Sequence, residues 1–129
     1  MASLLLDTHA LLWWLSEDQA MPDSARKLIA NKSNTVMVSA ASAWEIATKV
    51  RLGKLNSVAP IVEDFSNYLA NERFLELAIT TQHGIRAGSL PGPHRDPFDR
   101  MLIAQALEED LRIISNEQIF DNYGVTRFW

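Results

Sequence analysis

The chain contains no cysteine, and only three of its 129 residues are histidine. The absence of cysteine excludes disulfide bonds, thiolate zinc sites and cysteine nucleophiles. Three histidines argue against a histidine-rich metal site. No apolar run reaches the roughly 18 residues that a membrane span requires. The apolar N-terminus lacks a basic leader and is interrupted by Asp7, which is not typical of a signal peptide. These features predict a cytoplasmic protein without a membrane association.

The composition is otherwise that of an ordinary folded protein, with 47% hydrophobic and 22% charged residues. Its length is typical of one domain, and we expect a single domain over residues 1–129. The formal net charge is −4. Taken alone, this charge argues against a nucleic-acid partner, because phosphate binding usually requires an excess of basic residues.

Short apolar segments alternate with amphipathic ones along the whole chain. The apolar segments predict strands at residues 3–6, 35–39, 74–80 and 111–116. The amphipathic segments predict helices at residues 10–17, 22–32, 42–55, 62–72, 81–90 and 96–110, and a last helical turn from residue 117. Gly53 is the expected stop of the 42–55 helix. This alternation predicts an α/β fold in which helices cover a parallel sheet.

A carboxylate follows nearly every predicted strand. Asp7 comes directly after the first strand, Glu45 lies early in the helix after the second, and Glu117 follows the last. Asp96 and Asp99 open the 96–110 helix. Because parallel sheets carry their binding sites at the carboxyl ends of the strands, these acids are predicted to converge on one edge.

Helix capping offers a structural explanation for several of these acids. Asp96 can be an N-cap, followed by Pro97 at the first helical position and Asp99 in the first turn. Ser42 and Glu45 have the spacing of a capping box. Acids at helix N-termini gain about 0.3–1 kcal/mol from the helix dipole. Capping and metal binding are compatible roles for the same carboxylate.

Asp7 is harder to explain by capping alone, because it follows three leucines that are expected to form a buried strand. A buried carboxylate is unfavourable unless a counter-charge compensates it, and clustered carboxylates repel one another. No lysine or arginine lies beside Asp7 in the sequence. A hard divalent cation such as Mg²⁺ would provide the missing charge through oxygen ligands.

Four segments of the chain together resemble the signature segments of PIN-domain ribonucleases, in the branch of the VapC-type toxins. They are "LLLDTHALLWWL", "SAASAWEIATKVRLGKL", "HRDPFDRMLIAQAL" and "IISNEQIFDNYGV". They occur in the family's order and span nearly the whole chain. The resemblance implies a flavodoxin-like three-layer α/β/α sandwich with a central parallel sheet.

The resemblance also implies the site. Matched residue by residue, Asp7, Glu45, Asp99 and Glu117 correspond to the four catalytic acids. Asp96 is an additional acid of the "DPFDR" branch and would join them as a metal ligand. The fourth acid is most often aspartate in the family, so the longer Glu117 departs from the pattern, and Asn116 is an alternative at this position. The implied activity is hydrolysis of RNA with Mg²⁺, for which Mn²⁺ can substitute.

The implied biological setting is a type II toxin–antitoxin system in which the chain is the endoribonuclease toxin. The resemblance predicts a homodimer and a small antitoxin protein that wraps the helices of residues 10–70. Without the five candidate acids, the chain has 11 acidic and 12 basic residues. The net charge of −4 therefore does not argue against an RNA partner. The residues predicted to contact the RNA are Thr8, Asn116, Arg95 and Arg100. His9 and His94 are predicted to be polar surface residues.

Other functions remain open at this stage. An aspartyl-phosphate hydrolase or a receiver domain also has an aspartate after its first strand. That chemistry usually requires a second aspartate two residues later, where this chain has His9. A non-catalytic PIN-like scaffold that binds RNA or protein is the main alternative, and metal binding at the acids would discriminate against it. A nuclease acting on DNA is a third possibility.

Overall fold

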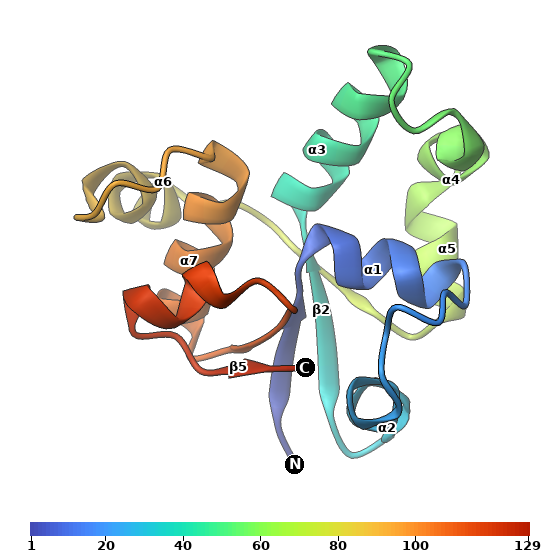
Figure 1. The fold of residues 1–129 in the computed structure, drawn as a ribbon, viewed down its shortest axis with the longest axis horizontal. Helices are drawn as coiled ribbons and strands as arrows, with labels where there is room; N and C mark the ends of the chain where they lie inside the picture. The colour runs from blue at the N-terminus through green and yellow to red at the C-terminus, as the bar shows by residue number, and fades with distance from the viewer.

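The computed structural model describes residues 1–129 and is built on a five-stranded sheet in which every neighbouring pair of strands is parallel (Figure 1). The strand order is β3-β2-β1-β4-β5. The strands are β1 (Ser3–Leu6), β2 (Thr35–Ser39), β3 (Leu75–Leu77), β4 (Arg112–Ile114) and β5 (Arg127–Phe128). The parallel α/β fold predicted from the sequence is therefore confirmed.

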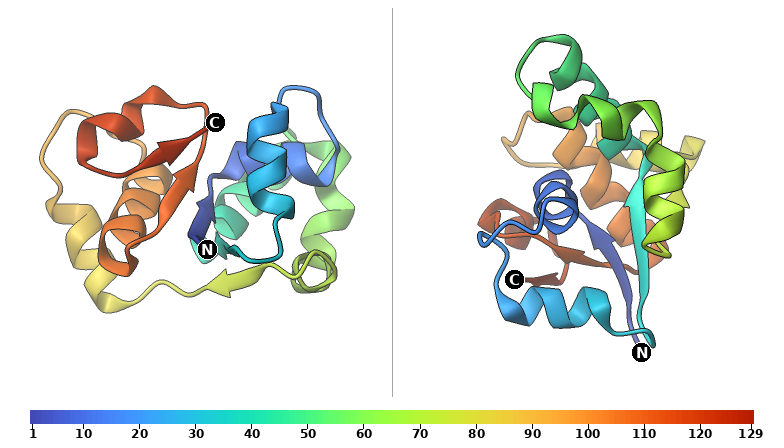
Figure 2. Two further views of the ribbon diagram at one scale, coloured as in Figure 1. Left: turned by 90° about the horizontal axis from the view of Figure 1, so that it is seen from below. Right: turned by 90° about the vertical axis from the view of Figure 1, so that its right-hand side faces the viewer.

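Helices cover both faces of this sheet (Figure 2). The α-helices are α1 (Thr8–Leu15), α2 (Asp23–Ala30), α3 (Ala40–Arg51), α4 (Ala59–Glu63), α5 (Phe65–Asn71), α6 (Thr81–Ser89) and α7 (Pro97–Glu109). Two 3-10 helices complete the chain, η1 (Asn56–Val58) and η2 (Gln118–Tyr123). None of the helices is long and apolar enough to cross a membrane.

The central strand β1 shows why the fold has three layers. Successive side chains of a strand point to opposite faces, and the leucines of β1 are fully buried on both. Leu4 and Leu6 pack in a cluster with buried residues of α1, α2, α3 and α5. Leu5 packs in a second cluster with Leu102 of α7 and Phe120 of η2. The three-leucine run thus reflects a strand that is covered on both sides.

Two predicted elements differ from the structure, and one strand was not predicted. The expected helix 62–72 is divided at Asp64, whose backbone (φ −136°, ψ 37°) is not helical, and α4 begins early because Pro60 favours a helix start. The expected strand 74–80 pairs with β2 over only three residues. The C-terminal segment, for which the sequence analysis names no element, adds strand β5, and Ser115 N–H donates to the Phe128 carbonyl at 3.0 Å.

The start of α3 also corrects the sequence-based interpretation. Ser39, the last residue of β2, is the N-cap, and its Oγ accepts from Ala41 N–H at 2.9 Å. Ser42 and Glu45 therefore lie inside the helix, and the predicted capping box between them is wrong. The predicted stop is confirmed, because Gly53 follows the C-cap with φ +77°, a conformation that glycine adopts without strain.

Candidate active site

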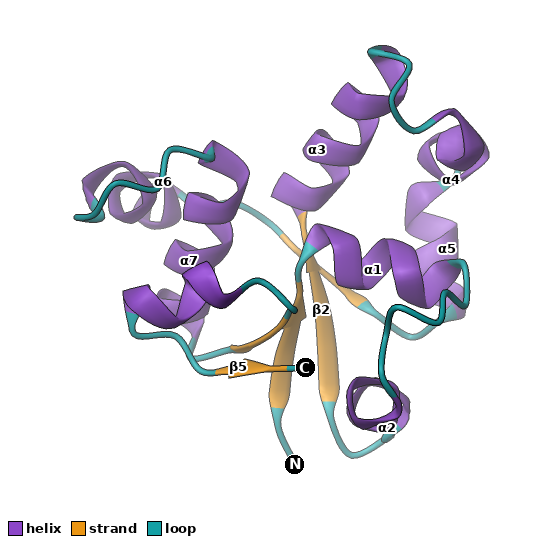
Figure 3. Ribbon diagram, viewed as in Figure 1, coloured by secondary structure: helices purple, strands orange, loops and turns teal.

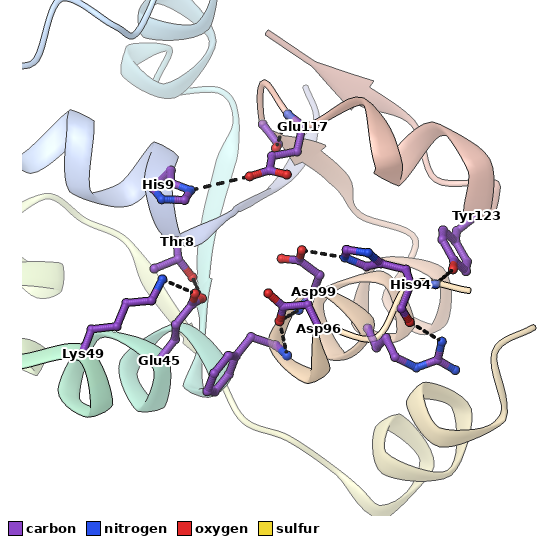
Figure 4. Close-up of polar contacts among 12 residues, drawn as sticks. Thr8, His9, Glu45, Lys49, His94, Asp96, Asp99, Glu117 and Tyr123 are labelled. Atoms are coloured by element: carbon purple, nitrogen blue, oxygen red, sulfur yellow. Dashed lines mark hydrogen bonds and ion pairs between the residues drawn. The ribbon is translucent and has the colours of Figure 1, made fainter. Parts of the chain in front are cut away.

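Strands β1 and β2 end on the same side of the sheet, and α1 and α3 begin there (Figure 3). This arrangement brings together the candidate acids that the sequence places after separate strands. Figure 4 shows the carboxylates around one common space: Glu45, Asp96, Asp99 and Glu117. The convergence predicted from the strand ends is therefore present in the structure.

Asp7 is the most buried of these acids, with 4% of its surface exposed. It is the N-cap of α1, and its Oδ1 accepts from Ala10 N–H at 2.7 Å. The pKa of Asp7 is raised to about 6, chiefly by burial and to a smaller extent by the charge of Asp99. Hydrogen bonds from Ser115 and Ala10 and the charge of His9 act in the opposite direction. No lysine or arginine forms a salt bridge with Asp7.

Glu45 is buried on the α3 side of the site and is held by two partners. Thr8 Oγ1 donates to Glu45 Oε1 at 2.7 Å and lies 3.0 Å from Ser42 Oγ. The Lys49 ammonium, one helical turn further on, donates to Glu45 Oε2 at 2.8 Å. Both carboxylate oxygens are thus occupied, so Thr8 and Lys49 fix the orientation of Glu45 (Figure 4).

The α7 side contributes Asp96 and Asp99. Asp96 is the N-cap of α7, where its Oδ1 accepts from the N–H groups of Phe98 at 2.9 Å and Asp99 at 3.2 Å, as the sequence predicts. His94 Nε2 lies 2.8 Å from Asp99 Oδ2. Burial raises the pKa of Asp99, the His94 hydrogen bond lowers it, and the neighbouring charges of Asp96 and Glu117 raise it.

The fourth acid, Glu117, follows β4, and 42% of its side chain is accessible. Its Oε1 lies 3.8 Å from His9 Nδ1, and its N–H donates to Ser115 Oγ at 2.9 Å. Asn116, the alternative at this position, is exposed to solvent. The charge of Glu117 contributes to the raised pKa of Asp99, so the two carboxylates lie within electrostatic range of each other.

The two arginines beside the Asp96–Asp99 pair have different environments. Arg95 is exposed. Arg100 donates from Nε to the Ala87 carbonyl (3.0 Å), from Nη1 to the His94 carbonyl (3.0 Å) and from Nη2 to the Leu90 carbonyl (2.5 Å). Arg100 therefore ties the loop before α7 to α6. An RNA contact by Arg100 stays a prediction, and it would have to use the two remaining N–H donors.

Three contacts at the site have no counterpart in the sequence analysis. Ser115 is fully buried and hydrogen-bonds Asp7, which no sequence pattern indicated. His94, expected at the surface, contacts Asp99 instead, and Tyr123 Oη accepts from His94 N–H at 3.3 Å. Gly92 allows this approach, because a Cβ there would lie 2.6 Å from Tyr123 Oη. The only sequence signal for these contacts is the turn-forming segment "PGPH" at residues 91–94, directly before the acids.

The donor set suits a hard divalent cation, since it consists of carboxylate and hydroxyl oxygens and contains no thiolate. Asp7 and Asp99 both have raised pKa values, and the charge of Asp99 acts on Asp7. A nearby positive charge would relieve this repulsion. In their present orientations, the histidine and acidic side chains do not come together in any group of three that could hold a metal ion. Two of the acids contact histidines instead, Asp99 with His94 and Glu117 with His9. The residues fit the chemistry of Mg²⁺ or Mn²⁺ and would need to rotate inward to hold it.

The sequence profile of the PIN domain family matches residues 4–125 of the chain. The chain belongs to the PIN domain family. Over 119 residues it is 26% identical to Ribonuclease VapC22 of Mycobacterium tuberculosis, an alignment that covers 92% of this chain and 89% of that protein. This similarity confirms the predicted resemblance to the VapC-type ribonucleases.

Two solved structures share the fold of this PIN domain. VapBC2 from Rickettsia felis, bound to a DNA fragment from its promoter, matches with a TM-score of 0.73 at 16% identity, over 98% of this chain and 97% of that one. FitAcB from Neisseria gonorrhoeae matches with a TM-score of 0.66 at 20% identity, over 98% of this chain and 96% of that one. These likenesses confirm the three-layer α/β/α architecture of the PIN domain.

Proposed function

We propose that this PIN domain is a divalent-metal-dependent endoribonuclease and the toxin of a type II toxin–antitoxin system. The similarity to Ribonuclease VapC22 supports this activity. The observation that carries the proposal is the buried Asp7, whose pKa is raised to about 6, which feels the charge of Asp99 and which forms no salt bridge with a lysine or arginine. We also propose that residues 1–129 act as a single PIN domain; the family match over residues 4–125 and the common sheet of the first and last strands support this.

Asp7 and Asp99 would hold Mg²⁺ or Mn²⁺, with Asp96, Glu45 and Glu117 in support. Such an ion, when bound, supplies Lewis-acid stabilisation of phosphoryl charge and makes water a better nucleophile. Asp7 is pre-oriented for this role by Ala10 N–H and the Ser115 hydroxyl. Glu45 is pre-oriented by its two partners, whereas Glu117 is free to move.

Other side chains around the acids would orient water, position Glu45 and contact the RNA. Glu117 can turn from His9 toward the space between the acids, where its carboxylate would orient the attacking water. Thr8 keeps Glu45 in place and limits its rotation. Arg95 and Asn116 are exposed beside the acids and would contact the RNA backbone, a contribution that is independent of the RNA sequence.

An RNA cleavage assay tests the activity. Purified protein is incubated with total transfer and ribosomal RNA in Mg²⁺, in Mn²⁺ and in EDTA. Asp7→Asn and Asp99→Asn remove one carboxylate each, and Asp23→Asn is the matched control, because Asp23 is an exposed acid in the first turn of α2. We expect discrete fragments that require metal, that disappear in the two site variants and that persist in Asp23→Asn.

The main alternative is a non-catalytic PIN scaffold. It predicts the same background cleavage by the parent and by both site variants on every RNA. Titration calorimetry with Mn²⁺ then separates the two functions. Binding that is lost in Asp7→Asn supports the enzyme, whereas the absence of Mn²⁺ binding excludes the proposed mechanism.

The proposed partners are RNA, a small antitoxin and a second copy of the chain. Support for the antitoxin comes from the matches to VapBC and FitAB structures. Co-expression with the product of a neighbouring open reading frame should yield a complex that no longer cleaves RNA. Sedimentation equilibrium tests the homodimer, which requires twice the 14.5 kDa mass of the chain.

A further inference from the structure

Lys49 is the only lysine or arginine that forms a salt bridge with one of the candidate acids. It lies one helical turn after Glu45 in α3, and its ammonium donates to Glu45 Oε2 at 2.8 Å (Figure 4). Only 8% of the Glu45 side chain is accessible, compared with 34% of the Lys49 side chain. The pair therefore joins a buried carboxylate to an ammonium on a side chain that is partly open to solvent.

The burial of Glu45 makes this pair different from an ordinary surface ion pair. Pairs of exposed side chains contribute little to stability, because water screens both charges. A buried carboxylate that loses its counter-charge is strongly unfavourable. Thr8 donates a neutral hydrogen bond to Glu45 Oε1 and supplies no charge. Lys49 is therefore the group that balances the charge of Glu45 in the metal-free chain.

The other acids of the site have no such counter-ion. Asp99 and Glu117 contact histidines, at 2.8 and 3.8 Å, and Asp7 forms no salt bridge at all. A histidine is charged only when it is protonated, whereas a lysine is ordinarily charged throughout the neutral pH range. Glu45 is thus the acid with a permanent positive charge beside it.

A divalent cation held by the carboxylates would bring a second positive charge to Glu45. Two positive charges at short distance repel each other strongly inside a protein, because the surroundings screen them less than water does. The Lys49 side chain is able to move away, because it is flexible and partly exposed. Thr8 is neutral and can keep its hydrogen bond to Glu45. Lys49 and the metal ion are therefore competitors for the same carboxylate.

We propose that Lys49 is an internal counter-ion of Glu45 that competes with the divalent cation and thereby lowers the affinity of the acid cluster for metal. This inference rests on the proposed function, because it concerns the metal site of the proposed nuclease. Lys49 stabilises the metal-free site and moves away when the metal binds. It is a positioning residue that sets the metal concentration required for activity.

Titration calorimetry of the full chain with Mn²⁺ tests the competition directly. Lys49→Met removes the charge and keeps a long apolar side chain, whereas Lys49→Arg keeps the charge. Lys54→Met is the matched control, because it makes the same change in net charge at an exposed lysine that forms no salt bridge. Urea unfolding of each variant, in EDTA and in Mn²⁺, verifies the fold and provides a second measurement.

We expect Lys49→Met to bind Mn²⁺ about 10- to 150-fold more tightly than the parent, the factor that corresponds to the loss of one competing hydrogen bond to a charged group. Lys49→Arg and Lys54→Met should bind Mn²⁺ as the parent does. In EDTA, Lys49→Met should unfold at a lower urea concentration, because Glu45 has lost its counter-ion. Mn²⁺ should raise the urea midpoint of Lys49→Met more than that of the parent, because the metal replaces the missing charge.

A double-mutant cycle with Glu45→Gln tests whether Lys49 acts through Glu45. In the Glu45→Gln background, Lys49→Met should change the Mn²⁺ affinity much less, because the shared carboxylate is gone. An equal gain in both backgrounds would overturn competition at Glu45. Unchanged or weaker Mn²⁺ binding by Lys49→Met would also overturn the inference, since this is the result expected of a lysine that only orients Glu45. The absence of Mn²⁺ binding to both the parent and Lys49→Met would overturn it as well.

RNA cleavage separates this inference from the proposed activity. The Mg²⁺ concentration that gives half-maximal cleavage should be lower for Lys49→Met than for the parent. If Lys49→Met gains Mn²⁺ affinity but neither protein cleaves any RNA, the nuclease fails and the counter-ion role stands. If the parent cleaves RNA with metal and Lys49→Met has an unchanged Mn²⁺ affinity, the counter-ion role fails and the nuclease stands.

Discussion

Replacing Asp7 by asparagine should stabilise the folded chain at neutral pH while removing activity. The pKa of Asp7 rises from 3.8 to about 6 because burial disfavours the charged carboxylate. The folded chain therefore holds this proton more tightly than the unfolded chain does. Between about pH 4 and pH 6 the unfolded state is the more ionised, so this residue makes the folded state progressively less stable as the pH rises.

The size of the effect follows from the shift of about two pH units, since one unit corresponds to 1.36 kcal/mol. At pH 7.5 the ionised Asp7 should cost about 3 kcal/mol in the free energy of unfolding, measured without divalent cations. Asparagine carries no charge and is an equally good N-cap, so it should keep the contact with Ala10 N–H. Asp7→Asn should therefore gain up to about 3 kcal/mol, or roughly 10 °C in Tm.

Urea unfolding of both proteins in EDTA, followed by circular dichroism from about pH 4 to pH 7.5, measures this difference. The two curves should meet near pH 4 and separate above it, and Asp23→Asn should follow the parent. Adding Mg²⁺ at neutral pH should then raise the stability of the parent but not of Asp7→Asn, because only the parent has all of the proposed ligands. Equal pH dependence in the parent and in Asp7→Asn would refute this account of the buried carboxylate.

Three further substitutions test the supports of the site, with urea unfolding as the measurement. Gly92→Ala should lower the free energy of unfolding by about 2 kcal/mol, since φ is +101° and the added Cβ would meet Tyr123 Oη; wild-type stability would contradict the close approach. Thr8→Val should cost about 1–3 kcal/mol and reduce RNA cleavage, because Glu45 Oε1 loses its buried donor. Arg100→Lys should cost about 2 kcal/mol by losing the forked contacts to three carbonyls, whereas unchanged stability would favour a role in RNA binding alone.

Much of the architecture was predictable because its determinants are local. The leucines of β1 and the β-branched run of β2 show the patterns of buried strands, and both strands have the predicted bounds. The N-cap at Asp96 and the stop at Gly53 depend on residues within one turn of a helix end. The convergence of the acids also follows from topology alone, since parallel strands present their carboxyl ends at one edge.

Local patterns failed where two residues competed for the same role or where an element was very short. Ser39, rather than Ser42, caps α3, because β2 runs into the helix without a loop. Strand β5 has two residues, too few for any periodicity, and exists because β4 offers it an unpaired edge. The break at Asp64 depends on how α4 and α5 each pack, which a single amphipathic pattern does not distinguish.

The sequence by itself therefore determined the fold class, the PIN domain resemblance and the identity of the acids. Only the tertiary structure decided what each acid contacts, such as Ser115 at Asp7 and His94 at Asp99. It also decided that Arg100 binds backbone carbonyls. The physical reason is that burial and long-range hydrogen bonds depend on which elements pack together. The pKa of Asp7 is a property of that packing and of no single segment.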